Sequence, residues 1–354
     1  MQYGESVYVT RRVPGPWLSR LQSKYPTRLH DGAGSPSRNE LLKALKDKSA
    51  VLCMLSDKMD SEAMDAAGQS LRIISTYSTG FDHIDVQEAT RRGILVTYTA
   101  DVLAEATADL TFALILAAAR NIVSGDRLTR SGRWRVGWMP DLLLGGSVSG
   151  RTLGIIGLGR IGSAVARRAR GFSMKVLYTS RNRKPEAEAA TGARYVTLEE
   201  LLSESDFVSI HASLAAPPPS EGEARVANGK GPPSPVIDMP RLKMMKKSAY
   251  LINTARGQLI DEPALARALK SGMIAGAGLD VYRKEPLPRS SSLCKLDNVT
   301  LLPHIGSATF ETRERMAEVA VTCIEKVLDG GLPDSAFTVN RELLTRRQAH
   351  RDSG

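Results

Sequence analysis

This chain is poor in aromatic residues and cysteine, and it lacks a long hydrophobic run. Phe, Trp and Tyr together make up 5% of its 354 residues. The three cysteines, Cys53, Cys294 and Cys323, lie far apart and form no CxxC pair or His/Cys cluster, so we expect no disulfide framework and no metal site. The longest apolar stretch, 110–119, is about ten residues, whereas a bilayer-spanning helix needs about twenty. The sequence therefore predicts a protein of a reducing compartment, the cytoplasm, with no membrane partner.

The charge balance is basic, with 48 Lys and Arg against 38 Asp and Glu. Such a balance favours anionic partners, which include nucleic acid, anionic membrane surfaces and small anionic ligands. The basic residues are spread along the chain, with local groups at 167–170, 181–184 and 346–351, and none of these groups contains an aromatic residue. We therefore expect small anionic ligands and a solvated surface, and no nucleic-acid partner.

Strands and helices alternate in two series. Apolar runs at 50–55, 71–75 and 93–97 alternate with helical patterns in the first 100 residues. A second series begins at Thr152 and continues to about residue 302. This alternation indicates parallel sheets with helices on both faces. The sequence therefore predicts an α/β fold of two doubly wound parallel-sheet domains.

A glycine-rich turn begins the second series. The apolar strand 153–156 leads into it, a helical pattern follows, and the next strand is expected at 175–180. In such a βαβ unit the first glycine permits a tight turn, the second lets the backbone approach a pyrophosphate, and the third lets the helix pack closely on the strand. The context is the one that the dinucleotide-binding motif requires, although a glycine-rich turn also occurs without a ligand. The predicted cofactor-binding residues of this turn are Gly157, Gly159, Arg160, Ile161 and Gly162.

The end of the next strand indicates which nucleotide binds. An acidic residue at this point binds the 2′-hydroxyl of NAD, whereas a neutral residue with a nearby arginine accommodates the 2′-phosphate of NADP. Here Ser180 is followed by Arg181, Arg183 and Lys184, with no acid. These four residues predict a preference for NADP(H), with NAD(H) as the second cofactor, and a solvated basic turn is the alternative.

Three polar residues follow later strands of the second series. Arg256 comes directly after one of them, where a guanidinium can grip a carboxylate with two parallel hydrogen bonds. Glu285 follows the strand that ends at Asp280, and His304 follows the last strand. A histidine beside a carboxylate is suited to proton transfer near neutral pH. The three residues fit hydride transfer to a carbonyl of a carboxylate-bearing substrate; the alternatives are a surface arginine and a packed or surface histidine.

Four segments share their order and spacing with a known family: GLGRIG at 157–162, NTARG at 253–257, GLDVYRKEP at 278–286 and PHIGSAT at 303–309. With them, nearly the whole chain resembles the D-isomer-specific 2-hydroxyacid dehydrogenases. The segments YSTGFDHID at 77–85 and LYTSRNRKPE at 177–186 look most like the glyoxylate/hydroxypyruvate reductase branch of that family.

The resemblance implies a role for each matched position. Arg256 would orient the carboxylate and the carbonyl of the substrate, with His304 as the acid/base and Glu285 as its partner. The backbone amides of Thr79 and Gly80 would bind the substrate carboxylate. Further residues implied in substrate binding are His304 and Ser307, and those implied in cofactor binding are Ser213, Thr254, Asp280 and Gly306.

The resemblance also implies a split first domain. Residues 1–100 and 305–340 would form a flavodoxin-like substrate domain, and residues 101–304 an inserted Rossmann domain that binds NAD(P). The helix at 101–120 and the arm with Trp134 and Trp138 match the segment through which these enzymes form homodimers; core packing is the alternative for the tryptophans.

Two further segments depart from the alternating pattern. Residues 216–235 are rich in Pro, Gly and Ser, without periodicity, and predict a disordered insertion that relatives lack, close to the expected cofactor site. Residues 341–354 are polar and predict a frayed basic tail.

We therefore expect NADPH-preferring reduction of glyoxylate and hydroxypyruvate, as small 2-oxo acids, to glycolate and D-glycerate. Two alternatives remain open. One is another D-2-hydroxyacid dehydrogenase, similar to phosphoglycerate dehydrogenase. The other is a non-catalytic scaffold that senses NAD(P)(H), like the corepressors of this superfamily.

Overall fold

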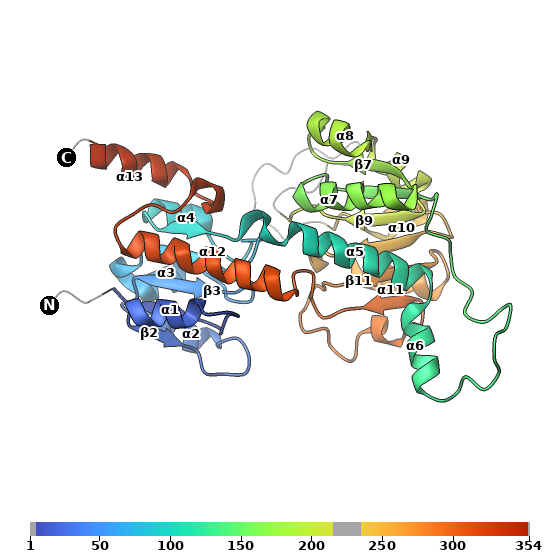
Figure 1. The fold of residues 1–354 in the computed structure, drawn as a ribbon, viewed down its shortest axis with the longest axis horizontal. Helices are drawn as coiled ribbons and strands as arrows, with labels where there is room; N and C mark the ends of the chain where they lie inside the picture. The colour runs from blue at the N-terminus through green and yellow to red at the C-terminus, as the bar shows by residue number, and fades with distance from the viewer. Residues whose placement is uncertain (1–4, 215–234, 353–354) are drawn as a thin grey trace. The chain divides into compact units, whose positions relative to one another are not determined.

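The apolar runs of the sequence form the strands of two parallel sheets. The computed structural model describes residues 5–214 and 235–352. The chain divides into unit 1, residues 1–103 and 307–354, and unit 2, residues 104–306 (Figure 1). The sequence predicts these boundaries after residues 100 and 304. The predicted insertion at 216–235 lies outside the described residues, except for Pro235.

Unit 1 contains a five-stranded parallel sheet of order β2-β1-β3-β4-β5. This order is that of the doubly wound flavodoxin-like fold. The strands are β1 Val7–Val9, β2 Thr27–Leu29, β3 Ala50–Cys53, β4 Ile73–Thr76 and β5 Leu95–Thr97. The helices are α1 Trp17–Lys24, α2 Arg38–Leu45, α3 Ser61–Ala67, α4 Val86–Arg91, α12 Phe310–Leu328 and α13 Glu342–Asp352.

Each face of this sheet has its own hydrophobic core. On one face, α2, α3 and α4 pack over Val51, Ile74 and Val96. On the other, α1 and α12 pack over the strands, with Ile324 and Val327 of α12 fully buried (Figure 1). The unit thus combines elements from the two ends of the chain in one core.

Unit 2 contains a seven-stranded parallel sheet of order β12-β11-β10-β9-β6-β7-β8. Numbered from its own first strand, this is the Rossmann order 3-2-1-4-5-6 with one more strand at the edge. The strands are β6 Thr152–Ile156, β7 Lys175–Thr179, β8 Arg194–Tyr195, β9 Phe207–Ile210, β10 Tyr250–Asn253, β11 Gly276–Leu279 and β12 Val299–Leu301. The helices are α5 Ala104–Ala119, α6 Ile122–Arg130, α7 Arg160–Ala169, α8 Pro185–Thr191, α9 Leu198–Glu204, α10 Met239–Met244 and α11 Glu262–Lys270. The predicted fold class, two doubly wound parallel sheets, is confirmed.

The apolar helix expected at 101–120 is α5, and it belongs to the core of unit 2. Its side chains Phe112, Leu114 and Ile115 are buried against the sheet and α7. No single helix in the described part of the chain is long and apolar enough to cross a bilayer. Among the described helices, α5 and α6 together have the length and apolar composition of a span, but the chain bends by 66° between them.

The segment after α6 is exposed to solvent, whereas α5 is largely buried. The residues that connect α6 to β6 project away from the sheet as an extended arm (Figure 1). Trp134 is 52% exposed and Trp138 86% exposed, and Leu144 is also exposed. The alternative that these tryptophans pack in the core is therefore wrong.

The predicted frayed tail at 341–354 is also wrong over most of its length. It contains α13, whose Leu343 is buried in the same core as α12. Arg347 donates to the carbonyl of Gly93 at 2.7 Å. Just before the helix, the Asn340 side chain accepts from the N–H of Val96 and donates to the carbonyl of Ile94, both at 2.9 Å. The sequence did not predict this attachment, because only a few residues of a mostly polar segment make it.

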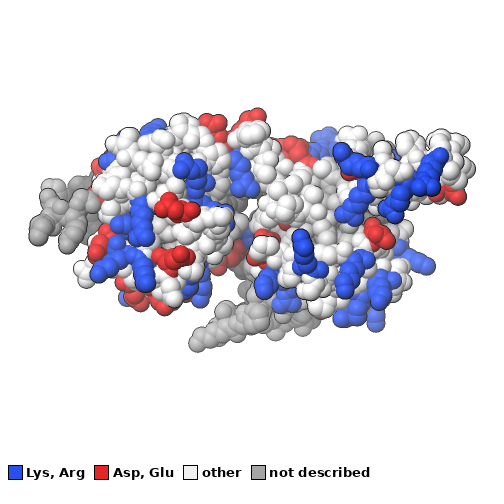
Figure 2. Space-filling model, turned by 90° about the horizontal axis from the view of Figure 1, so that it is seen from below, with Lys and Arg blue, Asp and Glu red and all other residues white. Residues whose placement is uncertain are grey.

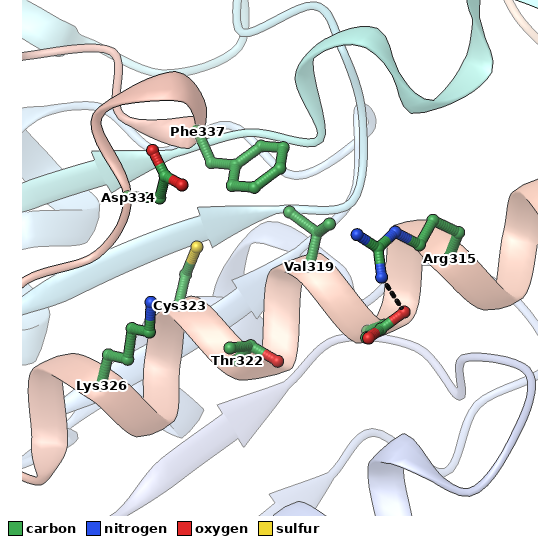
Figure 3. Close-up of a pocket in the computed structure, with 8 residues that line it drawn as sticks. Arg315, Val319, Thr322, Cys323, Lys326, Asp334 and Phe337 are labelled. Atoms are coloured by element: carbon green, nitrogen blue, oxygen red, sulfur yellow. Dashed lines mark hydrogen bonds and ion pairs between the residues drawn. The ribbon is translucent and has the colours of Figure 1, made fainter.

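A small cavity of about 100 Å³ lies in unit 1 between α12 and the turn at 334–337 (Figure 3). It is lined by the Sγ of Cys323 together with Lys326, Asp334 and Phe337. Burial raises the pKa of the Cys323 thiol to about 11. None of the predicted site residues lines this cavity, so it is separate from the candidate site. On the face shown in Figure 2, Lys and Arg side chains lie in separate small groups, with Asp and Glu side chains and uncharged surface between them.

Candidate active site

The glycine turn after β6 has the geometry that a dinucleotide needs. Gly157 has a φ of +100°, and a Cβ there would stand 2.8 Å from the backbone N of Ala212. A Cβ at Gly162 would stand 2.2 Å from the carbonyl oxygen of Gly157, so α7 packs directly on the turn. Gly159 differs, because no other described residue lies within 4 Å of the position of its Cβ. The turn is closed on the protein side and open at Gly159, where a pyrophosphate would approach.

The same turn leads into the N-terminus of α7. Gly159 is the N-cap of this helix, and it has no side chain to accept from the first N–H groups. Arg160 and Ile161 form the first turn, which contains no acidic residue. These N–H groups and the helix dipole therefore favour an anion.

The basic turn after β7 is made of exposed side chains. Ser180 donates to the carbonyl of Asn182 at 2.7 Å, which closes the turn. Arg181, Arg183 and Lys184 are all exposed. The fork of Arg183 is engaged by Glu188 of α8 through two hydrogen bonds of 2.8 Å. The four predicted residues are thus together, and an acid that sequence reasoning missed lies among them.

The register of the sheet brings the ends of β6 and β9 side by side. Ile156 pairs with Ile210, so Gly157 and His211 lie at the same edge. Burial lowers the pKa of His211 to about 3, and its Nε2 lies 2.8 Å from the Oγ of Ser209. Ser213, two residues further along, is exposed. The neutral His211 therefore supports the wall of the glycine turn without adding charge to it.

Thr254 follows β10, but its hydroxyl points into the protein. It lies 3.0 Å from the hydroxyl of Thr111 on α5, and the residue is 8% exposed. In this arrangement the side chain of Thr254 links the end of β10 to α5.

The loop that carries Arg256 is fixed by its neighbours. The buried side chain of Asn253 donates to the carbonyl of Arg256 at 2.9 Å and accepts from the N–H of Ala255 at 3.0 Å. A Cβ at Gly257 would stand 1.9 Å from the carbonyl carbon of Tyr282. Only glycine therefore lets this loop pack against the loop that carries Glu285.

Glu285 and His304 form a hydrogen-bonded pair. The Oε2 of Glu285 lies 2.7 Å from the Nδ1 of His304, and its Oε1 accepts from the N–H of Tyr282 at 3.0 Å. Burial raises the pKa of Glu285, but the hydrogen bond and the charge of His304, with smaller contributions from Tyr282 and Arg256, outweigh it and hold this pKa below its usual value. With Nδ1 directed at Glu285, Nε2 is the ring nitrogen left for proton transfer to a substrate.

Asp280 holds the turn on which His304 lies. Its carboxylate accepts from the N–H groups of Ile305 and Gly306, both at 2.8 Å, and its carbonyl accepts from the N–H of His304 at 2.9 Å. Burial raises the pKa of this carboxyl above its usual value, and the hydrogen bonds from Ile305 and Gly306 offset only part of that rise. His304 has a φ of +55°, a conformation that few residues other than glycine adopt. Asp280 and Gly306 therefore fix the catalytic candidate, in addition to any contact with a cofactor.

The remaining predicted substrate residues lie in unit 1. Thr79 follows β4, and its hydroxyl donates to the carbonyl of Ala100 at 2.8 Å. Among the described residues, the backbone N–H groups of Thr79 and Gly80 have no hydrogen-bond acceptor. Ser307 is half-buried, and its carbonyl accepts from the N–H of Thr309. The free N–H groups of the 79–80 turn are suited to a carboxylate.

A side-chain network supports the 79–80 turn and was missed by sequence reasoning. The Oγ1 of Thr76 lies 2.8 Å from the Oγ of Ser78 and 3.0 Å from the Nε2 of His83. Ser78 in turn donates to the carbonyl of Gly80 at 2.5 Å. The polar residues around this turn were the only available signal, and they did not reveal which of them meet.

Comparisons with known proteins agree with the motifs. The family model of the D-isomer specific 2-hydroxyacid dehydrogenase, NAD binding domain, matches residues 112–217 and 233–306. The glyoxylate reductase of Thermofilum pendens is 47% identical over 343 residues, which cover 96% of each chain. The glyoxylate reductase of Pyrococcus furiosus is 46% identical over 345 residues, which cover 97% of each chain.

Two solved structures are also similar to this chain over nearly its whole length. The TT0316 protein from Thermus thermophilus is 44% identical, with a TM-score of 0.84 over 94% of this chain and 99% of that one. An NADPH-dependent glyoxylate/hydroxypyruvate reductase from Sinorhizobium meliloti, in complex with NADP and malonate, is 31% identical. Its TM-score is 0.77 over 95% of this chain and 99% of that one.

Proposed function

The chain belongs to the D-isomer-specific 2-hydroxyacid dehydrogenases and is an NAD(P)-dependent oxidoreductase, and on this premise we propose that it reduces glyoxylate and hydroxypyruvate with a preference for NADPH. The observation that carries the proposal is the Glu285–His304 pair, with 2.7 Å between Oε2 and Nδ1. The Arg256 loop packs against the loop that carries Glu285, and the charge of Arg256 contributes to the lowered pKa of Glu285. An acid/base pair beside a guanidinium is the set that a 2-oxo acid requires.

The residues present fit a nicotinamide dinucleotide. Gly159 leaves room for a pyrophosphate, and the first N–H groups of α7 would hold its charge. Ser180 and the basic side chains after it would hold a 2′-phosphate. Ser213, Thr254 and Asp280 remain candidates for the nicotinamide side. When bound, the reduced nicotinamide supplies the hydride.

The side chains of unit 2 supply the rest of the chemistry. His304 donates a proton from Nε2 to the carbonyl oxygen of the substrate, and Glu285 stabilises the protonated ring through Nδ1. Arg256 holds the substrate carboxylate and polarises the carbonyl. In the reverse direction His304 accepts the proton from the hydroxyl.

The 2-oxo acid would be small. We propose that the backbone N–H groups of Thr79 and Gly80 bind the substrate carboxylate and that Ser307 also contacts the substrate. Two named relatives are glyoxylate reductases, and one solved neighbour is a glyoxylate/hydroxypyruvate reductase, which supports these two substrates.

We also propose that the protein is a cytoplasmic homodimer. Its arm exposes Trp134, Trp138 and Leu144 to solvent, and a second copy would cover them. The Phe112, Leu114 and Ile115 side chains of α5 are already buried within one chain, so the arm is the main dimer contact. Light scattering of the protein and of a Trp138→Ala variant tests this, and a monomeric wild-type protein would contradict it.

The decisive experiment measures NADPH oxidation by the purified protein with glyoxylate, hydroxypyruvate, pyruvate and phosphohydroxypyruvate. We expect the highest kcat/KM with the first two. A clear preference for phosphohydroxypyruvate would instead support a phosphoglycerate-dehydrogenase-like enzyme. Tight NAD(P)(H) binding without turnover of any substrate would support a sensing scaffold.

A further inference from the structure

The basic turn after β7 contains a negative charge that comes from another element. Glu188 lies in α8, eight residues after Ser180 in the chain, and its carboxylate grips Arg183. The Oε1 accepts from Nε and the Oε2 from Nη2, each at 2.8 Å, so the guanidinium is held on one whole edge. The Glu188 side chain is 16% exposed, whereas the Arg183 side chain is 66% exposed.

Glu188 is fixed in this place by the strand below it. The hydroxyl of Tyr178, a buried residue of β7, donates to Oε1 of Glu188 and accepts from the N–H of Lys184 at 2.8 Å. The carboxylate therefore cannot swing away without the loss of a hydrogen bond to the sheet. The hydrogen bonds from Arg183 and Tyr178 lower the pKa of Glu188 to about 2, so it carries its charge at any physiological pH.

This charge opposes the ligand for which the turn is suited. A 2′-phosphate adds negative charge, and its affinity depends on the net charge of the side chains around it. Glu188 neutralises Arg183 and occupies two of its donors, so Arg183 offers less to a phosphate than its exposure suggests. In NAD-specific enzymes an acid at the end of this strand binds the ribose 2′-hydroxyl. Here Ser180 follows the strand, and the acid that pairs with the turn lies on the following helix.

We propose that Glu188 is a specificity-determining residue, which weakens the preference for NADP(H) and keeps NAD(H) usable by the same site. The proposal rests on the cofactor site assigned above. It concerns the ratio of the two affinities, whereas the proposed function concerns which affinity is greater.

The test is calorimetric titration of the apoprotein with NADP⁺ and with NAD⁺. We expect Glu188→Gln to raise the ratio of NADP⁺ to NAD⁺ affinity about two- to fivefold, because an ion pair with one partner in solvent contributes only modestly. The gain should come from NADP⁺ and should shrink at high ionic strength. Glu188→Ala, which also suits a helix, should shift the ratio in the same direction.

Glu186→Gln is the matched control. Glu186 lies in the same first turn of α8, is exposed, and pairs with no arginine in the described part of the chain. Its removal takes away the same charge without contact with Arg183, so the ratio should change less than with Glu188→Gln.

Three outcomes would overturn the proposal. If both Glu188 variants bind NADP⁺ more weakly, Glu188 holds Arg183 in place for the phosphate. If the ratio does not change, Glu188 is only a structural partner of Arg183. If Glu186→Gln raises the ratio equally, the effect is one of general charge. A wild-type protein that prefers NAD⁺ would contradict the proposed cofactor preference, but a higher ratio in Glu188→Gln would still support this role for Glu188.

Discussion

The turns after β6 and β7 are expected to bind two parts of one cofactor, yet they are built in different ways. The turn after β6 is fixed by backbone contacts that exclude any side chain at Gly157 and Gly162. The turn after β7 depends on exposed side chains, and one of them is held by an acid from α8. A backbone contact that tolerates only glycine can be recognised in a sequence from the glycine itself. An ion pair cannot, because it depends on which two side chains the fold brings together.

The loops of the catalytic candidates are also fixed at their backbone, by hydrogen bonds with the buried Asn253 and Asp280 side chains and by the close contact at Gly257. Changes in these loops should therefore have the largest effects, and changes in the basic turn the smallest.

We expect the largest loss from His304→Ala. Removal of the proton donor should lower kcat for glyoxylate by about 10²–10⁴-fold, the usual contribution of a general acid. NADPH affinity should change little, because the ring is expected to face the substrate while the phosphates lie at Gly157–Gly162. Steady-state kinetics and calorimetric titration with NADPH measure the two quantities. Near-normal turnover would remove His304 from the mechanism.

Gly257→Ala should come next. The added methyl would stand 1.9 Å from the carbonyl carbon of Tyr282, so one of the two loops must move and Arg256 moves with it. A displacement of about 1 Å at a catalytic group costs about 10²-fold in kcat/KM. Gly171→Ala is the matched control, because Gly171 lies outside the site, in the segment Arg170–Phe172, and no other described residue stands within 4 Å of the position of its Cβ, so fold and activity should persist. Equal melting temperatures and equal activities for the two variants would break the comparison.

Glu285→Gln should change the pH dependence of the reaction. The glutamine carries no charge to stabilise a protonated His304, so the alkaline limb of the rate of reduction should move to lower pH. Because the pKa of Glu285 is lowered, its pairing persists at neutral pH and is lost only as the pH falls through that lowered value. A pH–rate profile of both proteins measures the shift, and an unmoved alkaline limb would contradict the pairing as a catalytic device.

The smallest effect is expected in the basic turn. Ser180→Asp with Arg181→Ala adds an acid and removes a cation, and it should lower the ratio of kcat/KM for NADPH over NADH about tenfold, the effect of one charge-assisted hydrogen bond. Arg194→Ala, on β8 outside the turn, serves as the control. A ratio that does not respond to the double change would identify residues 180–184 as a solvated basic turn.

Much of the fold was predictable because its signals are local. The strands are short apolar runs, and the turn after β6 requires glycine at fixed positions. The C-terminal helix was missed because its attachment depends on single residues, Leu343 and Asn340, within a polar segment.

The site shows the same limit. Arg256, Glu285 and His304 each follow a strand, and their roles remain predictions. The pairing of Glu188 with Arg183 was not predictable, since it joins a turn to the next helix through side chains alone. The sequence predicts only a cofactor-binding role for Asp280. Its hydrogen bonds to the N–H groups of Ile305 and Gly306 could not be predicted, because they depend on the backbone conformation of the turn at 304–306.

The discontinuity of unit 1 has a consequence for biosynthesis. Its five strands leave the ribosome first, but Ile324 and Val327, which cover one face of their sheet, are made only after all of unit 2. Domains fold largely as they emerge, so we expect unit 2 to fold first on the ribosome, while β1–β5 remain an incomplete and aggregation-prone nascent segment. A chain released before α12 is complete would contain a finished Rossmann unit and an unfinished partner.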